Sequence, residues 1–155
     1  MLYIRKATMQ DIDLLIRLRM DYLREDHGAL QPDQEDAIKR QLTDYFPKHL
    51  QDGTFIGVLA EIDGAVVSVA YLAISEKPAN PAFITGVTGT LLNVLTFPAY
   101  RKQGIATKVV RRIMEEAKQA GVSSIELSAT ASGRPLYEKL GFHPSKYTAM
   151  RVGLV

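Results

Sequence analysis

The sequence predicts a single domain of the α/β or α+β class, and three observations support this prediction. Segments with a strand-like pattern alternate with segments of helical periodicity along the chain. No internal repeat, low-complexity tract or long linker divides the sequence. The length of 155 residues and the apolar content of 46% suit one domain, residues 1–155, with one contiguous core.

The N-terminal third is expected to fold as one strand followed by two helices. Thr8, with Asp11 three residues later, resembles a capping box, which starts a helix. The apolar stripe of that helix also includes one charged residue, Arg19. Pro47 should kink or end the second helix, because proline has no N–H to donate. The expected elements are a strand at 3–6 and helices at about 9–25 and 34–50.

The middle of the chain is expected to form three strands. The dipeptide Asp63-Gly64 strongly favours a tight hairpin turn between the first two. The third has apolar residues on both faces, so it should be central and buried. Pro98 ends it, because proline cannot donate to the sheet. The expected strands are 54–62, 66–75 and 90–97, and residues 76–89 should form a loop.

The C-terminal third contains the clearest helical pattern, at residues 104–120. Apolar residues recur there at every fourth position, and Gly121 stops the helix. A short helix should begin near Ser132, a candidate cap, with Pro135 in its first turn. The expected strands on either side of this short helix are 124–129 and 148–154.

The junction at residues 101–106, between the third strand and the clearest helix, is a candidate anion site. A helix N-terminus has unpaired N–H groups and a partial positive charge, so it favours anions. Gly104 lets a ligand approach the backbone closely, and Ala106 leaves room beside it. Basic side chains, including Lys108, lie nearby in the sequence. A pyrophosphate would suit this arrangement.

Better-known phosphate motifs are absent from this junction. A Rossmann fingerprint needs three glycines, of which only Gly104 is present, and no Walker A pattern occurs. Taken alone, residues 101–106 fit an ordinary basic turn as well as they fit a pyrophosphate site.

A second motif, Leu-Tyr-Glu-Lys-Leu-Gly-Phe at residues 136–142, follows the next expected strand. Together the two motifs resemble the GCN5-related N-acetyltransferase (GNAT) family. In that family, Arg/Gln-x-x-Gly-x-Gly/Ala binds the CoA pyrophosphate, and Leu-Tyr-x-x-x-Gly-Phe supplies a tyrosine beside the thioester sulfur. Ala106 is a tolerated variant of the first motif. The resemblance covers the whole chain in element order, and implies a mixed, mostly antiparallel sheet of about six to seven strands flanked by about four helices.

The resemblance implies direct transfer of an acetyl group from acetyl-CoA to a primary amine. Leu95 is the best candidate for the backbone group that polarises the thioester carbonyl. Tyr137 is the candidate acid for the leaving CoA thiolate, with a packed core tyrosine as the alternative. The residues expected to bind the co-substrate are Leu95, Thr96, Phe97, Arg101, Lys102, Gln103, Gly104, Ile105, Ala106, Thr107 and Tyr137.

The sequence identifies neither the acceptor nor a general base. Asn93 stands where some relatives carry a carboxylate, and an amide cannot act as a base. Glu25, Asp26 and His27 could line the acceptor side, although a solvated surface is the more usual place for such residues. The same holds for Glu126.

Composition argues against several other classes of protein: nucleic-acid-binding, disulfide-bonded, metal-binding and membrane proteins. The net charge of +2 is too small, and no basic stripe with stacking aromatics is evident, so nucleic-acid binding is not expected. The absence of cysteine excludes disulfides and zinc–thiolate sites. His49 and His143 are isolated, so no metal is expected. No apolar run could span a bilayer and no signal-peptide pattern is present, so we expect a soluble cytoplasmic protein.

Two hypotheses of function follow. The first is an acetyl-CoA-dependent N-acetyltransferase acting on a small-molecule or peptide amine, with no membrane partner. The second is a non-catalytic module of the same fold that binds CoA as a sensor or scaffold. By family analogy, either could form a homodimer through the C-terminal strands.

Overall fold

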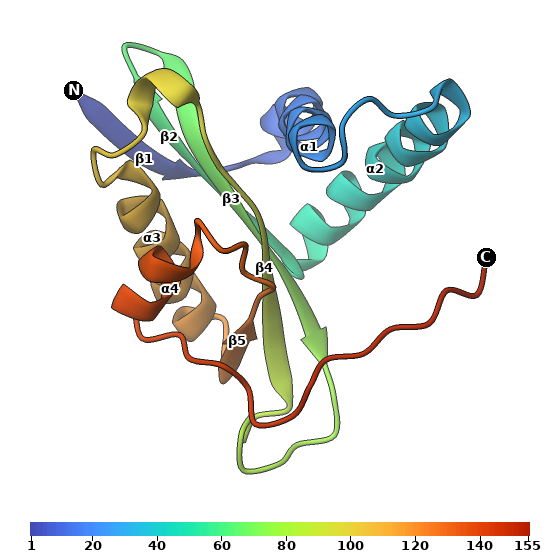
Figure 1. Cartoon of the computed structure of the whole chain (residues 1–155), viewed down its shortest axis with the longest axis vertical. Coiled ribbons are helices and arrows are strands. Elements are labelled where there is room, and N and C mark those ends of the chain that lie inside the picture. Colours follow the sequence, from blue (N-terminus) through green and yellow to red (C-terminus); the bar gives the residue numbers. More distant parts are fainter.

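A computed structural model describes residues 1–155 as one sheet flanked by helices (Figure 1). The sheet has five strands in the order β1-β2-β3-β4-β5. All neighbours are antiparallel except β4 and β5, which are parallel. The strands are β1 (Leu2–Lys6), β2 (Phe55–Ile62), β3 (Ala65–Glu76), β4 (Val87–Thr96) and β5 (Ser124–Glu126). The helices are α1 (Ile12–His27), α2 (Pro32–Asp52), α3 (Ile105–Gln119) and α4 (Arg134–Lys139), with 3-10 turns η1 (Met9–Asp11) and η2 (Pro98–Tyr100).

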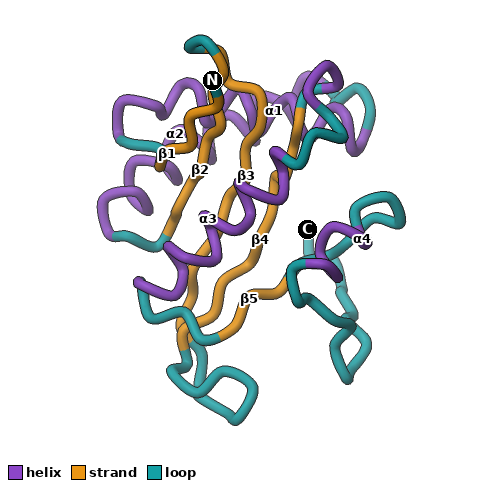
Figure 2. The backbone as a smooth tube through the Cα atoms, turned by 90° about the vertical axis from the view of Figure 1, so that its left-hand side faces the viewer, coloured by secondary structure: helices purple, strands orange, loops and turns teal.

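The sheet separates two hydrophobic clusters. Successive side chains of a strand point to opposite faces, and in β2 and β3 both sets are buried. Val58 and Leu72 pack with α3 on one face, whereas Leu59 and Tyr71 pack with α1 and α2 on the other. Figures 1 and 2 show the helices on the two faces of the sheet. The β2–β3 hairpin therefore anchors both layers.

Several local signals are confirmed. Thr8 and Asp11 form both hydrogen bonds of a capping box. Asp63 and Gly64 both have positive φ angles, as a tight hairpin turn requires, and they join β2 to β3. The α3 helix lies within the predicted range and ends before Gly121, which has a φ of +80°.

Other expectations about element bounds are corrected. The α2 helix continues through Pro47 to Asp52. β4 begins at Val87, inside the expected loop, because the chain there pairs with both β3 and β5. Gly133, not Ser132, is the N-cap of α4, and its N–H donates to the Thr130 hydroxyl at 3.1 Å.

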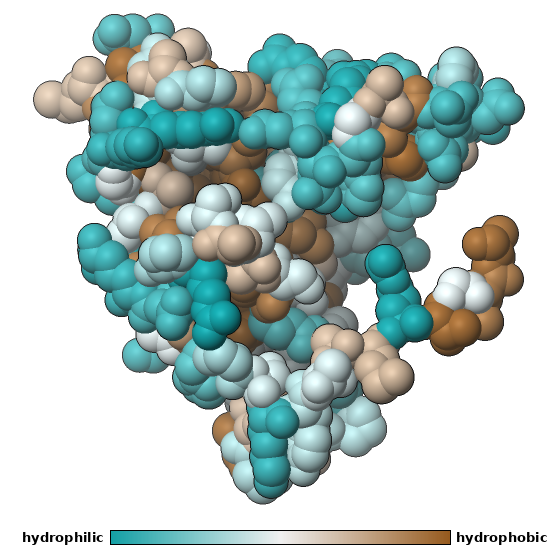
Figure 3. All heavy atoms as spheres, in the orientation of Figure 1, coloured by the Kyte–Doolittle hydropathy of each residue, from teal (hydrophilic) through white to brown (hydrophobic).

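The predicted strand at 148–154 is wrong, and the sheet has five strands, not six or seven. A strand needs a partner for its backbone groups, and the tail has none within this chain. Its apolar side chains are exposed, including Met150, Val152 and Leu154. Figure 3 shows the apolar tip of the tail standing away from the body of the molecule. β5 is also shorter than the expected 124–129. None of the helices has the length and hydrophobicity that a bilayer crossing requires.

The Arg5–Asp11 ion pair makes the start of α1 sensitive to pH. Arg5 Nη1 lies 2.8 Å from Asp11 Oδ2, which also accepts from the Thr8 N–H at 2.7 Å. The hydrogen bonds from Arg5 outweigh burial and lower the pKa of Asp11 to about 2. Asp11→Asn should therefore reduce the free energy of unfolding at pH 7 by about 1 kcal/mol, since solvent partly screens the pair.

The pH dependence of this loss is measured by urea unfolding. A carboxyl with a lowered pKa contributes stability above its unfolded pKa of about 3.9 and loses it as the pH falls toward the folded value. The gap between wild type and Asp11→Asn should therefore close between about pH 4 and pH 2. Asp13→Asn, an exposed neighbour without an ion pair, should change little at any pH. A gap that stays constant down to pH 2 would contradict this account.

Candidate active site

The site begins at a bulge in β4. Tyr71 pairs with Leu92, and Val69 pairs with Leu95, so two residues of β4 lie opposite one residue of β3. One of the two is Asn93, with a φ of +57°. Asparagine tolerates this left-handed conformation better than most residues. The bulge interrupts the regular alternation of β4 just before its end.

Beside the bulge, β4 loses its partner on one edge. Its parallel pairing with β5 covers only three residue pairs and ends at Thr90 with Glu126. After β5 the chain leaves the sheet toward α4 (Figure 2). The edge of β4 from 91 to 96 is therefore open to an extended ligand that can hydrogen-bond to the backbone.

The register decides which peptide groups face this opening. The Phe97 N–H donates to the Val67 carbonyl of β3 at 3.0 Å. Hydrogen-bonded and non-hydrogen-bonded residue pairs alternate along an antiparallel ladder. Leu95 is two residues before Phe97, so its N–H and C=O also point toward β3. The Thr96 carbonyl faces the other way and accepts from Arg101 Nε at 2.7 Å. In this register the Leu95 peptide groups that the sequence proposes for the thioester face β3, and those of Thr96 face the open edge.

The loop after β4 presents an uncapped helix N-terminus. Lys102 and Gly104 have φ angles of +62° and +78°, and α3 begins at Ile105. The N-cap makes no side-chain hydrogen bond, and the first turn carries no acidic residue. The first loop-to-helix hydrogen bond is donated by Lys108. The preceding N–H groups of the first turn are thus free for an anion.

The side chains of this loop occupy different environments. The Ile105 side chain is in the core, so only its backbone can serve a ligand. Residues 101–104 are exposed, and Ala106 and Thr107 are half-buried. Arg101 Nη2 donates to Glu25 Oε1 at 2.9 Å, which joins the loop to the end of α1.

Tyr137 lies half-buried on α4, with its ring edge-on to Phe142 at 5.8 Å between centroids. Its hydroxyl has no hydrogen-bond partner in the protein, unlike that of Tyr71, which donates to the Leu15 carbonyl at 2.7 Å. Burial raises the pKa of Tyr137, and Tyr22 of α1 raises it further. The group is therefore a protonated phenol at neutral pH, free to donate.

The candidate acceptor residues of the sequence separate into two sets. Glu25 contacts the loop through Arg101, whereas Asp26 pairs with its neighbour His27 at 3.2 Å on the surface. Glu126 is exposed and lies 3.8 Å from Lys77. No group of three or more His, Asp or Glu side chains is placed to hold a metal ion.

Arg19 joins the β4 bulge through a contact that the sequence does not predict. Arg19 Nη1 donates to Asn93 Oδ1 at 3.3 Å, which brings α1 to the β4 bulge. The available signal was a charged residue on the apolar stripe of a helix. Its partner in the fold, 74 residues away, could not be read from local pattern.

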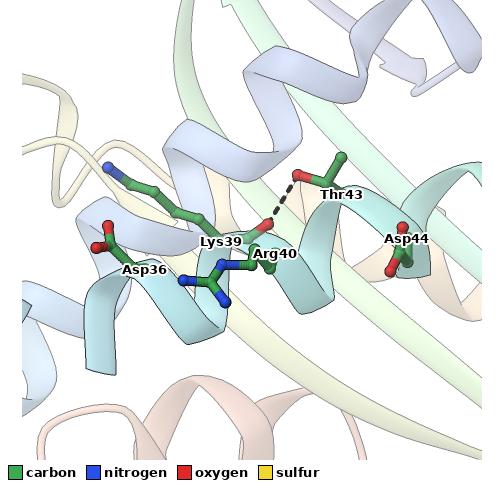
Figure 4. A pocket seen from close by; sticks show the side chains of 5 residues that line it. All are labelled: Asp36, Lys39, Arg40, Thr43 and Asp44. Atoms are coloured by element: carbon green, nitrogen blue, oxygen red, sulfur yellow. Dashed lines mark hydrogen bonds between the residues drawn. The ribbon is translucent and has the colours of Figure 1, made fainter. Parts of the chain in front are cut away.

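A depression of about 400 Å³ on α2 is not a competing site. Its lining comes from a single helix and is entirely polar: Asp36, Lys39, Arg40, Thr43 and Asp44 (Figure 4). The contact drawn there, from the Thr43 hydroxyl to the Lys39 carbonyl at 2.7 Å, is internal to the helix. The β4 bulge, in contrast, has the buried amide of Asn93 and the half-buried Arg19.

In this α+β fold, β4 and β5 separate beside the uncapped N-terminus of α3. Such a domain can bind an extended ligand that carries an anionic group. Comparison with known proteins identifies the family. The sequence model of the acetyltransferase (GNAT) family matches residues 14–142. The chain belongs to the GNAT acetyltransferase family.

Solved structures agree with this assignment. A predicted acetyltransferase with acetyl-CoA from Clostridium acetobutylicum is 32% identical, with a TM-score of 0.85 over 97% of this chain and 96% of that one. A GCN5-related N-acetyltransferase from Ralstonia eutropha is 25% identical, with a TM-score of 0.82 over 98% and 99%. The glucosamine-6-phosphate N-acetyltransferase of Arabidopsis thaliana, at 18% identity, shares the fold, with a TM-score of 0.71 over 98% of each chain.

The loop geometry generates a test at Gly104. A side chain at this position meets no protein atom within 4 Å, so its effects arise from the positive φ and from any ligand. Gly104→Val should weaken binding of CoA at least tenfold, because the side chain would obstruct the approach to the free N–H groups. Isothermal calorimetry with CoA measures this change.

Gly121→Val is a matched control for backbone strain. Gly121 has a φ of +80°, open space around it, and a place at the other end of α3. Both variants should lose similar stability in thermal unfolding, but only Gly104→Val should lose affinity. Equal affinities in the two variants would refute the close approach of a ligand to Gly104.

Proposed function

We propose that the protein transfers the acetyl group of acetyl-CoA directly to a primary amine. The observation that carries this proposal is the uncapped N-terminus of α3 beside the open edge of β4. Family membership and the acetyl-CoA in the 32% identical relative support it. The backbone of the first α3 turn binds the pyrophosphate, and the β4 edge binds the pantetheine arm. The proposed binding residues are Thr96, Phe97, Arg101, Lys102, Gln103, Gly104, Ile105, Ala106, Thr107 and Tyr137; Leu95, whose peptide groups point toward β3, is not among them.

The binding of a pyrophosphate rearranges Arg101. In the structure its guanidinium contacts the Thr96 carbonyl and Glu25. The Arg101 and Glu25 side chains are 44% and 54% exposed, so the ion pair is worth little in water. A pyrophosphate, with one negative charge on each of its two phosphates, competes well for the same cation. Arg101 can therefore change partners at low cost.

The reaction forms a C–N bond and breaks the C–S bond of the thioester. The neutral amine attacks the carbonyl carbon, and oxygen gains negative charge that the Thr96 N–H, on the open side of β4, stabilises. Loss of one such donor typically slows a reaction about 10²–10³-fold. As the intermediate collapses, the CoA sulfur leaves and takes the proton of the Tyr137 hydroxyl. The tyrosinate is reprotonated by the proton that the amine releases.

The amine must lose a proton before it attacks. An alkyl amine with a pKa of about 10.4 is only about 0.04% neutral at pH 7. The bulge residue Asn93 cannot accept that proton, and no carboxylate contacts it. We propose that water in the opening carries the proton away, so that turnover rises with pH until the amine is neutral.

Binding and turnover of acetyl-CoA test the proposed function directly. Calorimetry should detect CoA at millimolar concentration, and a screen of amines with detection of the released thiol should find an acceptor. No heat and no thermal shift with CoA would refute the whole proposal. Binding without turnover on any amine would instead support a non-catalytic sensor.

Tyr137→Phe tests the proton donor. The variant should lower kcat about 10²–10⁴-fold with the best acceptor and leave CoA affinity unchanged, because the ring still packs against Phe142. Tyr147→Phe, on an exposed tyrosine, is the control and should keep wild-type kcat. Unchanged turnover in Tyr137→Phe would reject its role as the acid.

We also propose that two copies associate through their C-terminal segments. The tail exposes Met150, Val152 and Leu154 in alternation, and the outer edge of β5 has no partner strand. If the tail of one copy paired as a strand with the β5 edge of a second copy, the unpaired backbone of β5 would gain a partner. The apolar side chains of the tail would also be buried. Sedimentation of the full chain and of a chain ending at residue 146 distinguishes a dimer of this kind from a monomer.

A further inference from the structure

Arg19 differs from the other partly buried arginines of the protein. Three arginines are neither fully exposed nor fully buried: Arg5, Arg19 and Arg112. Arg5 pairs with Asp11 and Glu61, and Arg112 pairs with Glu116. Arg19 has no carboxylate within salt-bridge distance. Its only side-chain hydrogen bond goes to the neutral amide of Asn93, at 3.3 Å.

The amide that meets Arg19 is itself incompletely bonded. Asn93 is fully buried, with 0% of its surface exposed. Its Oδ1 accepts from Arg19, and its Nδ2 is the one buried side-chain polar atom in the protein without a hydrogen-bond partner. An orphaned buried donor costs about 1–3 kcal/mol, and native proteins leave few of them. Two adjacent groups therefore present donors with no acceptor.

The surroundings of Arg19 are aromatic. The guanidinium lies 5.9 Å from the centre of the Tyr22 ring. Tyr71, Tyr45 and Asp26 are the other ionisable groups in its neighbourhood. Asp26 is engaged with His27, and the Tyr71 hydroxyl with Leu15. Burial lowers the pKa of Arg19, which shows that its charge is partly removed from water.

We propose that Arg19 and Asn93 bind the carboxylate of the acceptor, so that the acceptor is an amino acid or a similar small amine that carries a carboxylate. This inference rests on the proposed function. One guanidinium and one amide provide a single positive charge and several N–H donors, which match a monoanion with two acceptor oxygens. A phosphate dianion would leave one charge without a partner.

The location suits an acceptor that faces the thioester. Asn93 lies three residues before Thr96 on β4, which is about 10 Å along a strand and less across the bulge. Tyr22, which contacts Arg19, is near enough to raise the pKa of Tyr137. A carboxylate at Arg19 thus lies on the α1 side of the opening, and the amine of the same molecule can extend toward the acetyl group.

Matched amines test this proposal. Each free amino acid is compared with its carboxamide, which has nearly the same shape but no negative charge. Rates are expressed per neutral amine, because the amide also lowers the pKa of the neighbouring amine. Wild type should acetylate the best free amino acid with a kcat/KM roughly 10- to 100-fold above that of its carboxamide. Arg19→Gln should remove this preference, mainly through KM for the amino acid, and leave KM for acetyl-CoA unchanged. Arg19→Lys should restore part of it, since it keeps the charge but not the fork of donors.

Arg17→Gln is the matched control. Arg17 lies on the same helix, is exposed and forms no ion pair, so this variant should keep the wild-type preference. Thermal unfolding of each variant separates loss of recognition from loss of fold. A comparison of kcat/KM for O-phosphoethanolamine and ethanolamine tests whether the site prefers a phosphate instead. A preference for the phosphate that depends on Arg19 would overturn the carboxylate assignment.

The remaining outcomes separate this inference from the proposed function. Equal use of amino acids and carboxamides by wild type, or an unchanged preference in Arg19→Gln, would overturn the inference and leave acetyl transfer intact. If no amine is acetylated, calorimetry of N-acetyl amino acids provides an independent measurement. Binding that is lost in Arg19→Gln supports the carboxylate subsite even then, and the absence of binding overturns it.

Discussion

The departure of β4 from regular sheet geometry is the constraint on which the site depends. Over Thr88 to Thr90 the strand is bonded on both edges, and beyond that only β3 holds it. The bulge at Asn93 then adds one residue on the β4 side. Together these features leave the backbone edge of β4 unpaired just before the loop that leads into α3. A regular β4 that remained paired to β5 would have no edge to offer a ligand.

The two faces of the sheet provide the two halves of the proposed reaction. The α3 face, with its buried Val109 and Ile113, fixes the helix whose N-terminus receives the pyrophosphate. The α1 and α2 face fixes Leu15 and Leu18, and so places Arg19 against β4. Because both clusters pack on the same β2–β3 hairpin, the donor and acceptor sides are held in fixed relative positions by one sheet.

Local chemistry explains which parts of the fold the sequence could predict. A capping box, an Asp-Gly turn and the repeat of α3 are short-range signals, and the structure confirms all three. The helix through Pro47 and the missing strand at 148–154 depend instead on packing and on a pairing partner. The orientation of the Leu95 peptide depends on register. The contact of Arg19 with Asn93 joins distant segments, so only the fold reveals it.

The two arginines of the site illustrate how exposure governs their use. Arg101 is paired in water, where an ion pair contributes about 0–1 kcal/mol, so a ligand can replace Glu25 easily. Arg19 is half-buried and has lost part of its hydration without gaining a carboxylate. A permanent carboxylate partner there would be hard to displace, because separating a buried pair costs several kcal/mol. Leaving Arg19 with a neutral amide keeps its charge available to an anion, as the proposed carboxylate subsite requires.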